Sequence, residues 1–489
     1  MSLDALVELD HPVLRSPAAE VSFPDPELGR DIQSLTEVLT EFRHAKGFGR
    51  AISAPQIGLP KRLICFHLGA QPFAVLNPHV TWRSEETFDV WDDCLSVPDA
   101  LVRVRRHRSI SLEYDDPAGR RRVWRELPPD LSELLQHEMD HLDGVLMTER
   151  AVDAESMRPI SERDALLTHR PPEHRLSLTA IAEAADVIDP VFRSSPQYEC
   201  ESLSRALGCT LTVKVESLNP IRSFKGRGVD YYLEKASQRG KVPAMVCASA
   251  GNFGQAMAYV GRRRGVPVTV FAAESANPLK VGQMRAFGAK VELVGADFDA
   301  AKAAARERAE QSGSLMVEDG ALPEISEGAG SIAVELLAGD EAYDAVLVPL
   351  GNGALLTGIA RWFKAASPST RVVGVCSSGA DAMARSWRAG VPVEGEHVAT
   401  IADGIAVRVP VPAAVEDMKG LVDDVLLVSD EELGTAMQLL FREAGLLIEP
   451  AGAAGVAALV GDHSFRGQRV ATVLCGSHLA PEVRATVVG

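Results

Sequence analysis

The hydrophobic positions of the first 150 residues fall in short β-rich segments that are followed by one helix. Apolar residues concentrate at 62–68, 73–80 and 109–115, as is typical of strands. Residues 131–144, which read LSELLQHEMDHLDG, then have the pattern of a helix. Strands followed by a helix in this arrangement predict an α+β domain.

From about Val268 the pattern changes to a strict alternation of apolar strands and longer helical segments. Four strand-like segments each precede a helical one, at residues 266–271 and 278–288, 290–295 and 297–311, 345–350 and 357–366, and 371–376 and 380–387. Strands that alternate with helices of this length predict βαβ units and a parallel, doubly wound sheet of the α/β class. The two parts of the chain therefore predict two different fold classes.

A polar segment from Ala151 to about Asp189, broken by Pro159, Pro171 and Pro172, separates the two patterns. Because 489 residues are too many for one ordinary hydrophobic core, two or three domains are expected. We therefore predict a first domain over residues 1–150, a linker with helical pieces over 151–189, and a second domain over 190–489.

The composition favours a globular protein that acts on small molecules. A hydrophobic content of 46% with 24% charged residues does not indicate disorder. The formal net charge of −17 argues against a nucleic-acid or anionic-membrane surface, because both need clustered Lys and Arg. The longest apolar run, around Ala451 to Val460, is too short to span a bilayer, and no signal peptide is evident. We expect a cytoplasmic protein, whose seven scattered cysteines are free thiols or serve a site.

The helix at 131–144 contains the sequence H-E-x-x-H from His137 to His141. This spacing puts two imidazoles one turn apart on the same helix face, where both can bind one metal ion. Glu138, beside the first histidine, can shuttle the proton of an activated water. By itself the motif is also compatible with a solvated helix that carries two surface histidines. Two further segments favour the metal site, residues 49–58 (GRAISAPQIG) and residues 92–96 (DDCLS).

With these three segments in this order, residues 1–150 resemble the peptide deformylases. Residues 11–15 (HPVLR) also resemble the opening of that family. The resemblance implies one divalent metal ion, iron or zinc, that is held by Cys94, His137 and His141. Two of these ligands are the histidines of the helix motif, and the third comes from the DDCLS segment.

The same resemblance implies that Glu138 is the general base and acid, and that Gln56 and the backbone N–H of Leu95 bind the formyl oxygen. Such donors would stabilise the oxyanion that forms on attack at the formyl carbon. Ala51 and Asp93 stand where the family usually has glycine, and each adds a side chain where the backbone normally approaches substrate. The cleft is therefore expected to be narrower and more negative, which leaves a small N-formyl compound as an alternative to N-formylmethionyl peptides.

Lys225 lies between a strand at 212–217 and a helix at 229–238, near the helix N-terminus. There the helix dipole disfavours its charge, and only a neutral amine attacks an aldehyde. Two Gly-rich turns between a strand and a helix accompany it. Residues 249–254 (SAGNFG) can receive an anion such as a carboxylate, and the small residues of 351–355 (GNGAL) allow close approach to a phosphate. Alone, such a turn could equally hold a nucleotide.

Together with residues 328–332 (GAGSI), 400–405 (TIADGI) and 449–454 (EPAGAA), these segments resemble the pyridoxal-phosphate (PLP) enzymes of the tryptophan-synthase β fold, or fold type II. The threonine/serine dehydratase branch is the most similar one. The resemblance implies PLP as cofactor, with Lys225 as its Schiff-base lysine and Asn252 bonded to its ring oxygen. The implied phosphate site is Gly351, Asn352, Gly353, Ala354 and Leu355. The implied site for the substrate carboxylate is Ser249, Ala250, Gly251 and Asn252.

Four positions depart from that branch. Cys475 stands where serine usually faces the pyridine nitrogen, and a neutral thiol there still avoids full protonation of the ring, which favours elimination over transamination. Ala250 replaces the second base of racemases, so racemisation is not expected. Phe253 replaces a common histidine and alters the pocket beside the cofactor. Only Asp381 remains where some members carry acidic cation ligands, so a cation site is not expected there.

We therefore predict a bifunctional enzyme, in which a metal-dependent deformylase is fused to a PLP-dependent lyase. The lyase removes a β-substituent from an L-amino acid, with Lys225 as the base at Cα. The two sites could act in sequence, because an N-formyl group blocks the α-amine that must react with the cofactor. Alternatives are β-replacement, a threonine synthase-like lyase, two unlinked activities, or a non-catalytic deformylase-like module for binding or oligomerisation. By analogy with this fold, a homodimer is expected.

Overall fold

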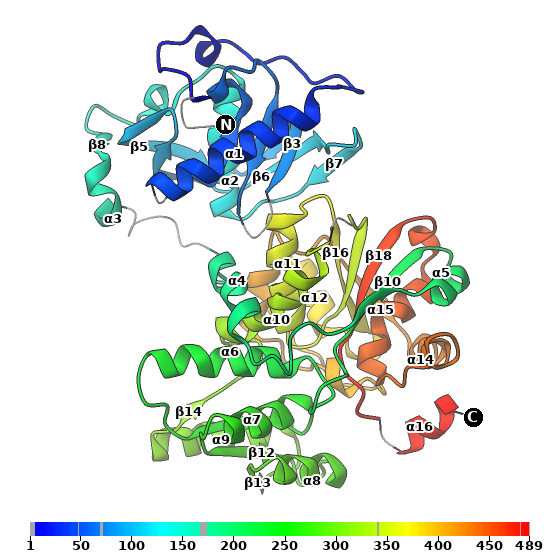
Figure 1. Ribbon diagram of the computed structural model, residues 1–489. Helices are drawn as coiled ribbons and strands as arrows, with labels where there is room; N and C mark the ends of the chain where they lie inside the picture. Colours follow the sequence, from blue (N-terminus) through cyan, green and yellow to red (C-terminus); the bar gives the residue numbers. More distant parts are fainter. Residues whose placement is uncertain are drawn as a thin grey trace. The chain divides into compact units, whose positions relative to one another are not determined.

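The computed structural model describes residues 5–46, 48–68, 72–166, 174–339, 342–479 and 481–488. The chain forms two compact units (Figure 1). The smaller unit comprises Met1–Arg175 with Lys364–Ser369, and the larger unit comprises Leu176–Phe363 with Thr370–Gly489. Each unit has hydrophobic clusters of its own, so each can hold a site on its own scaffold.

The smaller unit is built on two antiparallel sheets with strand orders β1-β2-β3-β6-β7 and β4-β5-β8. The strands are β1 (Ala51–Ser53), β2 (Leu63–Phe66), β3 (Phe73–Arg83), β4 (Thr87–Cys94), β5 (Val97–His107), β6 (Ile110–Asp115), β7 (Arg121–Trp124) and β8 (Met157–Pro159). The helices are α1 (Leu28–Lys46), α2 (Pro129–Leu142) and the short α3 (Arg163–Leu166). This combination confirms the predicted α+β class.

Helix α2 carries the H-E-x-x-H motif and packs against β1 and β5. Pro129 presets the backbone of its first turn, and Asp130 in that turn complements the positive end of the helix dipole. The chain turns away at Gly144, where φ is 74° and a Cβ would come 2.8 Å from the backbone of Arg15. One face of the helix enters the core through Leu131, Leu134, Leu135, Met139 and Leu142. The polar residues of the motif occupy the remaining face.

The larger unit contains two sheets, where the alternating pattern suggested one. A six-stranded sheet has the order β17-β16-β15-β18-β10-β9, in which the β9–β10 pair is antiparallel, and a four-stranded parallel sheet has the order β13-β12-β11-β14. The strands are β9 (Gln197–Glu199), β10 (Thr210–Val215), β11 (Met245–Ala248), β12 (Val268–Ala272), β13 (Lys290–Leu293), β14 (Leu315–Met316), β15 (Ala345–Pro349), β16 (Arg371–Ser377), β17 (Asp424–Val428) and β18 (Arg469–Leu474). The predicted α/β class is confirmed.

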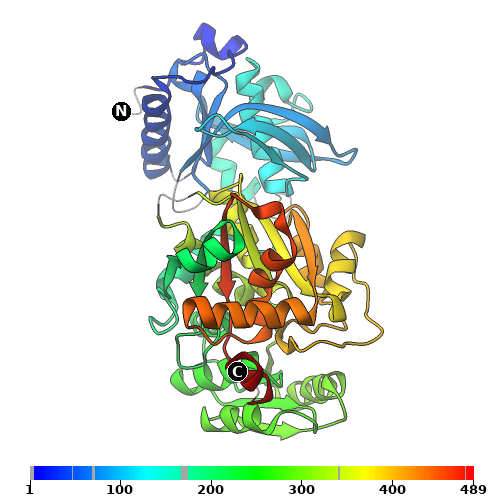
Figure 2. The ribbon, with the colours of Figure 1, turned by 90° about the vertical axis from the view of Figure 1, so that its right-hand side faces the viewer.

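Helices cover both faces of the six-stranded sheet (Figures 1 and 2). The helices of this unit are α4 (Leu178–Val187), α5 (Glu201–Leu207), α6 (Lys225–Gln238), α7 (Asn252–Arg263), α8 (Pro278–Ala286), α9 (Phe298–Ser312), α10 (Pro323–Leu336), α11 (Ala354–Ala366), α12 (Ala382–Ala389), α13 (Pro412–Met418), α14 (Asp430–Ala444), α15 (Pro450–Gly461) and α16 (Pro481–Val488). The arrangement is doubly wound, as predicted.

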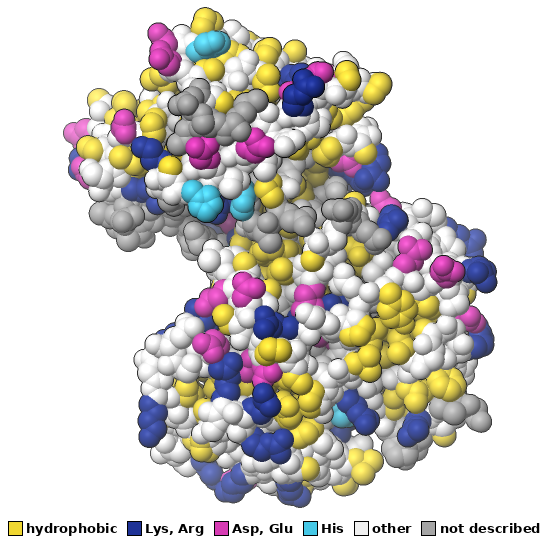
Figure 3. Space-filling model, viewed as in Figure 1, with side chains coloured by type: hydrophobic (Ala, Val, Ile, Leu, Met, Phe, Trp, Pro, Cys, Tyr) yellow, Lys and Arg dark blue, Asp and Glu magenta, His cyan; other side chains and the backbone are white. Residues whose placement is uncertain are grey.

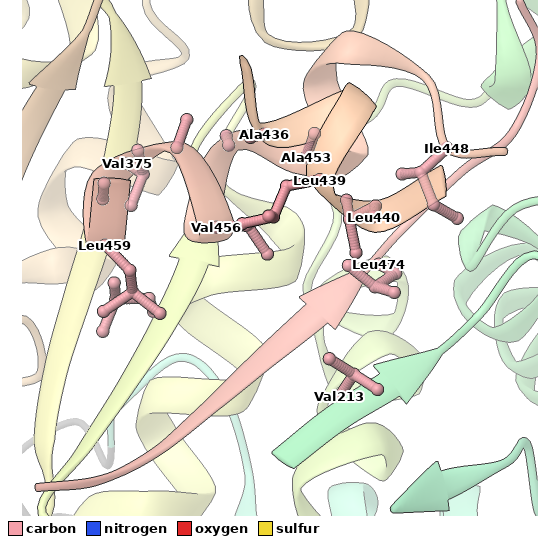
Figure 4. Close-up of a cluster of buried hydrophobic side chains, with 14 of the residues drawn as sticks. Val213, Val375, Ala436, Leu439, Leu440, Ile448, Ala453, Val456, Leu459 and Leu474 are labelled. Atoms are coloured by element: carbon pink, nitrogen blue, oxygen red, sulfur yellow. The ribbon is translucent and has the colours of Figure 1, made fainter. Parts of the chain in front are cut away.

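The last strand, β18, lies inside the six-stranded sheet between β15 and β10. Figure 4 shows the hydrophobic cluster on it, in which Leu440 of α14 lies beside Leu474 of β18, while Leu459 of α15 lies on the side of Val375. A Cβ at Gly455 would overlap the Thr472 hydroxyl, so glycine lets α15 lie directly on the sheet. The longest apolar run of the sequence is therefore a buried core helix.

The segment expected as a linker contains regular elements. Strand β8 pairs with β5 in the smaller unit, and α4 packs on α10 in the larger unit. Pro171 and Pro172 lie outside the described residues, and the boundaries at 150 and 190 stay a prediction. None of the helices in the described ranges is long and apolar enough to cross a membrane. On the face shown in Figure 3, acidic and basic side chains are interspersed over the larger unit.

A buried ion-pair network fixes the start of α6, the helix that begins at Lys225. The Arg227 guanidinium is fully buried and donates to both carboxylate oxygens of Glu216 at 2.8 Å. It also donates to Glu335 on α10 at 2.7 and 2.9 Å, and Lys214 Nζ on β10 donates to the same carboxylate at 2.5 Å. Burial lowers the pKa of Arg227, but the two carboxylates more than offset this and raise it overall. The network thus joins β10, α6 and α10.

Replacing Arg227 tests how much this network stabilises the fold. Arg227→Met is expected to lower the free energy of unfolding by about 3–5 kcal/mol, because Glu216 would stay buried without its partner. Urea unfolding of the full chain measures the change. The matched control is Arg239→Met, because Arg239 is 67% exposed and pairs with Glu324, and it is expected to cost less than about 1 kcal/mol. Equal costs for the two variants would contradict the assignment.

Candidate active sites

Three side chains of the smaller unit converge on one point, Cys94 at the end of β4 and His137 and His141 on α2. Their ligand atoms all lie within 4.8 Å of one another, and all three residues are buried. Cys94 Sγ is 3.2 Å from His141 Nε2. Elsewhere in the described ranges, no group of three potential metal ligands comes this close together. The structure therefore brings together the three residues that the motifs predicted as metal ligands.

Asp92 orients one of these histidines. Its Oδ2 atom lies 3.1 Å from His137 Nδ1, which leaves Nε2 of the ring for a metal ion. Arg106 donates to Asp92 at 2.8 Å and to Asp140 at 2.5 Å, and so holds the carboxylate in turn. A carboxylate behind a histidine ligand fixes its tautomer and raises its basicity. Together with the soft Cys94 thiolate, these residues fit a divalent ion such as zinc or iron.

Glu138 and Gln56 lie beside this point, and both are buried. Ser53 Oγ donates to the Glu138 carboxylate, and burial raises the pKa of that carboxyl, which suits a group that takes and returns a proton. The Gln56 side chain accepts from Ser53 N at 2.8 Å, while its Nε2 atom lies 3.8 Å from Cys94 Sγ. The amide that was predicted to bind the formyl oxygen is therefore held next to the ligand cluster.

The cavity at the cluster has a volume of only about 20 Å³, roughly the space of one water. It is lined by Gly49, Arg50, Ala51, Asp92, Asp93, Leu95, Glu133, Leu134, His137 and Glu138. Ala51 and Asp93, the two departures from glycine, are both part of this wall. Asp93 pairs with Arg163 at 2.9 Å, and the Arg163 guanidinium lies 5.0 Å from the centroid of the Phe48 ring. The negative charge that Asp93 adds is thus compensated by Arg163.

The larger unit has a much larger cavity, about 910 Å³, at the carboxyl ends of its parallel strands. Lys225, the first residue of α6, is part of its wall. The Lys225 Nζ atom lies 4.6 Å from the ring centroid of Phe224 and 6.0 Å from that of Phe253. The residues of the sequence prediction that line this cavity are Lys225, Ser249, Ala250, Gly251, Asn252, Phe253, Asn352 and Cys475.

The turn between β15 and α11 is short and consists of small residues, Gly351 to Gly353. Gly353 has a φ of 98°, and a Cβ on Gly351 would come 2.7 Å from the Gly404 carbonyl oxygen. Ala354 and Leu355 follow as the first residues of α11. The N-terminal N–H groups of a helix therefore come directly after the turn, as a phosphate site requires.

Asn252 and Cys475 approach each other from different sheets. Asn252 Nδ2 donates to Glu449 Oε1 at 2.8 Å, and its Oδ1 atom is buried without a hydrogen-bond partner among the described residues. A Cβ on Gly476 would overlap the Glu449 carboxylate, so only glycine fits after Cys475. Burial raises the pKa of the Cys475 thiol, which keeps it neutral. The cavity thus presents the unpaired amide oxygen of Asn252, the neutral thiol of Cys475 and Asn352 of the glycine-rich turn. These groups fit PLP.

Sequence reasoning gave no role to the carboxylates of this cavity, among which Asp319 and Glu449 lie next to predicted site residues. Asp319 Oδ2 accepts from Lys225 Nζ at 2.7 Å and from Asn352 Nδ2 at 3.2 Å. Asp319 follows β14, and residues that follow parallel strands gather at one edge of a sheet, which is the signal that could have found it. However, β14 has only two residues and leaves no visible hydrophobic pattern. Asp381, the acidic residue left where some family members bind a cation, forms an ion pair with Arg385 at 2.9 Å.

Comparison with known proteins supports two separate assignments. Residues 188–476 match the family described as pyridoxal-phosphate dependent enzyme, and residues 3–157 match the family described as polypeptide deformylase. Both ranges agree with the resemblances inferred from the motifs.

The individual relatives each match about three fifths of this chain. The biosynthetic L-threonine dehydratase of Pasteurella multocida is 33% identical over 59% of this chain and 57% of its own length. The L-threonine ammonia-lyase of Geobacter sulfurreducens is 35% identical over 58% of this chain and 71% of its own length. The chain thus spans about three fifths of the first of these relatives. A solved structure of threonine deaminase isoform 2 from Solanum lycopersicum is 28% identical with a TM-score of 0.59, covering 63% of this chain and 91% of that one.

The carboxylate behind His137 gives a test of the metal centre. Asp92→Asn is expected to weaken the binding of a divalent ion by about 10–100-fold, because an amide holds the imidazole less firmly than a carboxylate. Competition with a chromophoric chelator measures the affinity, and elemental analysis measures the ion bound after purification. The control is Asp89→Asn, because Asp89 lies on the same strand as Asp92 but forms an exposed ion pair with Arg105 on β5, and this change should leave the affinity unchanged. Equal affinities of the two variants would contradict the assignment.

Glu449 makes the stability of the larger unit depend on pH. Burial, with the charge of Asp403, raises the pKa of Glu449 to about 7. This pKa lies above the pKa of about 4.3 that a glutamate has in the unfolded chain. The protonated carboxyl therefore contributes its full stability below about pH 4.3, and this stability is lost as the pH rises through about 7. Glu449→Gln should therefore gain stability relative to wild type between these two pH values. Urea unfolding at several pH values measures this, and a difference that is independent of pH would refute it.

Proposed function

This chain belongs to the pyridoxal-phosphate dependent enzyme family, and we propose from that premise that its larger unit is a lyase for a β-substituted L-amino acid. The match of residues 3–157 to the deformylases confirms the predicted fusion. The observation that carries the proposal is the position of the Lys225 amine. It stands at a helix N-terminus, in the wall of a cavity of about 910 Å³ that has room for a cofactor and an amino acid.

The residues of this cavity supply the parts that a β-elimination needs. Bound PLP would supply the electron sink that makes the Cα proton acidic. Lys225 would take that proton, and the backbone N–H groups from Ser249 to Asn252 at the start of α7 would bind the substrate carboxylate. Cys475 would offer the ring nitrogen a neutral partner, which favours elimination over transamination. The relatives named as threonine dehydratases support this reaction class.

We propose that the smaller unit hydrolyses an N-formyl amide. A divalent ion held by Cys94, His137 and His141 would lower the pKa of a water and polarise the formyl group. Glu138 would take and return the proton, while Gln56 Nε2 and the Leu95 backbone N–H would donate to the formyl oxygen.

The size of the cavity at the ion site bears on the substrate. A volume of about 20 Å³ favours a small N-formyl compound over a peptide. The same observation also favours an alternative, in which this unit is a non-catalytic module for binding or oligomerisation. Retention of Cys94, Glu138 and both histidines in one buried cluster supports the hydrolase.

The fusion suggests that the two sites act in sequence. An amino acid must present a free α-amine to the cofactor, and an N-formyl group removes the nucleophilicity of that amine. Removal of formate by the smaller unit would therefore create a substrate for the larger one. We further expect a cytoplasmic homodimer, by analogy with members of this fold.

Two other reactions remain as alternatives for the larger unit. β-Replacement differs from elimination only in that a second nucleophile adds at Cβ. The assay below distinguishes the two reactions, because replacement yields no 2-oxo acid. A threonine synthase-like reaction on a phosphorylated substrate needs free cations in the cavity. Within the described wall, the cations other than Lys225 already pair with acids, namely Lys280, Lys302, Arg306 and Arg408.

An assay with L-amino acids and their N-formyl derivatives tests the proposal. The metal- and PLP-loaded protein is expected to release formate and a 2-oxo acid from an N-formyl amino acid. Lys225→Ala should stop after formate, and Glu138→Ala should yield neither product from the formyl compound but still convert the free amino acid. Formate release and 2-oxo acid release are followed together.

Other outcomes separate the alternatives. If free amino acids react and no formyl compound does, the smaller unit is not the proposed hydrolase. If formate is released only from formyl-Met peptides and threonine reacts alone, the two activities are unlinked. If neither product forms from any compound in the panel, the proposed function fails.

A further inference from the structure

The carboxylate of Asp319 faces Lys225 in the large cavity in a way that the proposed reaction does not use. Its Oδ2 atom accepts from Lys225 Nζ at 2.7 Å and from Asn352 Nδ2 at 3.2 Å. Its Oδ1 atom is buried and has no hydrogen-bond partner among the described residues. The Asp319 side chain as a whole is 11% exposed. It is thus a nearly buried carboxylate with one free acceptor on the wall of the cavity.

Most other acids on the same wall have partners of their own. Glu318 pairs with Lys302 and with Arg306 at 3.0 Å. Asp299 pairs with Arg408, and Asp403 pairs with Lys280. These four cations and three acids leave one positive charge over, and the wall also contains the acidic residue Glu394. Lys225 is therefore the cation that balances Asp319.

Lys225 must be a neutral amine when it takes the Cα proton, so at that stage it is not a cationic partner of Asp319, and this inference rests on the proposed function. A buried carboxylate without a cationic partner is costly. We propose that Asp319 binds a positively charged group of the substrate side chain, and that the lyase acts on L-amino acids whose β-substituent is a protonated amine. A neutral hydroxyl at the same position would form only a weaker bond to the carboxylate.

The chemistry of elimination suits such a substrate. The Cα–H bond breaks and Lys225 takes the proton, while the Cβ–N bond breaks and its electron pair leaves with the amine. Because the β-amine is already protonated, it departs as neutral ammonia and needs no further proton donor. Water then releases the remaining carbon skeleton as a 2-oxo acid with a second ammonia, so that 2,3-diaminopropionate and one water give pyruvate and two ammonia.

The test compares L-2,3-diaminopropionate with L-serine, which carries a hydroxyl in place of the β-ammonium. Binding of both is measured by calorimetry in the PLP-loaded Lys225→Ala chain, in which turnover stops. Adding Asp319→Asn is expected to weaken binding of the diamino acid by about 10–100-fold and that of serine by less than about threefold. Asp319→Glu should retain most of the preference because it keeps the charge.

The matched control is Glu318→Gln, which removes a neighbouring acid of the same wall and should leave the ratio of the two affinities unchanged. A second readout is the ratio of kcat/KM for 2-oxo acid release in chains that keep Lys225. Equal weakening of both ligands by Asp319→Asn, or tighter binding of serine in the parent Lys225→Ala chain, would overturn the inference.

The failure of this inference is distinguishable from that of the proposed function. If serine or threonine yields a 2-oxo acid while the diamino acid neither binds nor reacts, the lyase stands and the cationic subsite falls. If no amino acid yields a 2-oxo acid but the diamino acid binds through Asp319, the subsite stands and the lyase falls.

Discussion

The chemistry of the larger unit depends on the buried guanidinium of Arg227. It lies two residues after Lys225 on the first turn of α6, and its ion pairs with Glu216 and Glu335 tie that turn to β10 and to α10. A lysine that must meet a cofactor and then a substrate proton needs a fixed Cα position, because small displacements are costly in catalysis. Since charges inside a protein are tolerated only with full pairing, the network permits very few arrangements of these three elements.

Close packing of backbones provides the second constraint on this site. Glycines at 455 and 476 let α15 and the end of β18 approach their neighbours without a side chain between them. As a result, one cavity is lined by Cys475 from one sheet, Asn252 from the other and Asn352 from the turn before α11. The cavity exists because two sheets end at the same place, which is where α/β proteins usually bind their ligands.

The two units differ in how they present their reactive groups. The ligand cluster of the smaller unit is buried and borders about 20 Å³ of space with an Asp93–Arg163 pair at its wall, whereas Lys225 borders about 910 Å³. A buried, preorganised set of ligands suits a small reacting group such as a formyl amide. A large cavity with charged walls can hold a cofactor together with a whole amino acid.

The sequence by itself determined both fold classes and most of the proposed site residues, because H-E-x-x-H, the glycine-rich turns and the strand–helix alternation are local patterns. Tertiary structure alone decided that the larger unit has two sheets, that β18 lies inside one of them, and that Arg163 compensates Asp93. It also decided that Asp319 meets Lys225, 94 positions earlier in the chain. Such pairings are set by which strands hydrogen-bond and which helices pack, and no local pattern of polar and apolar residues encodes them.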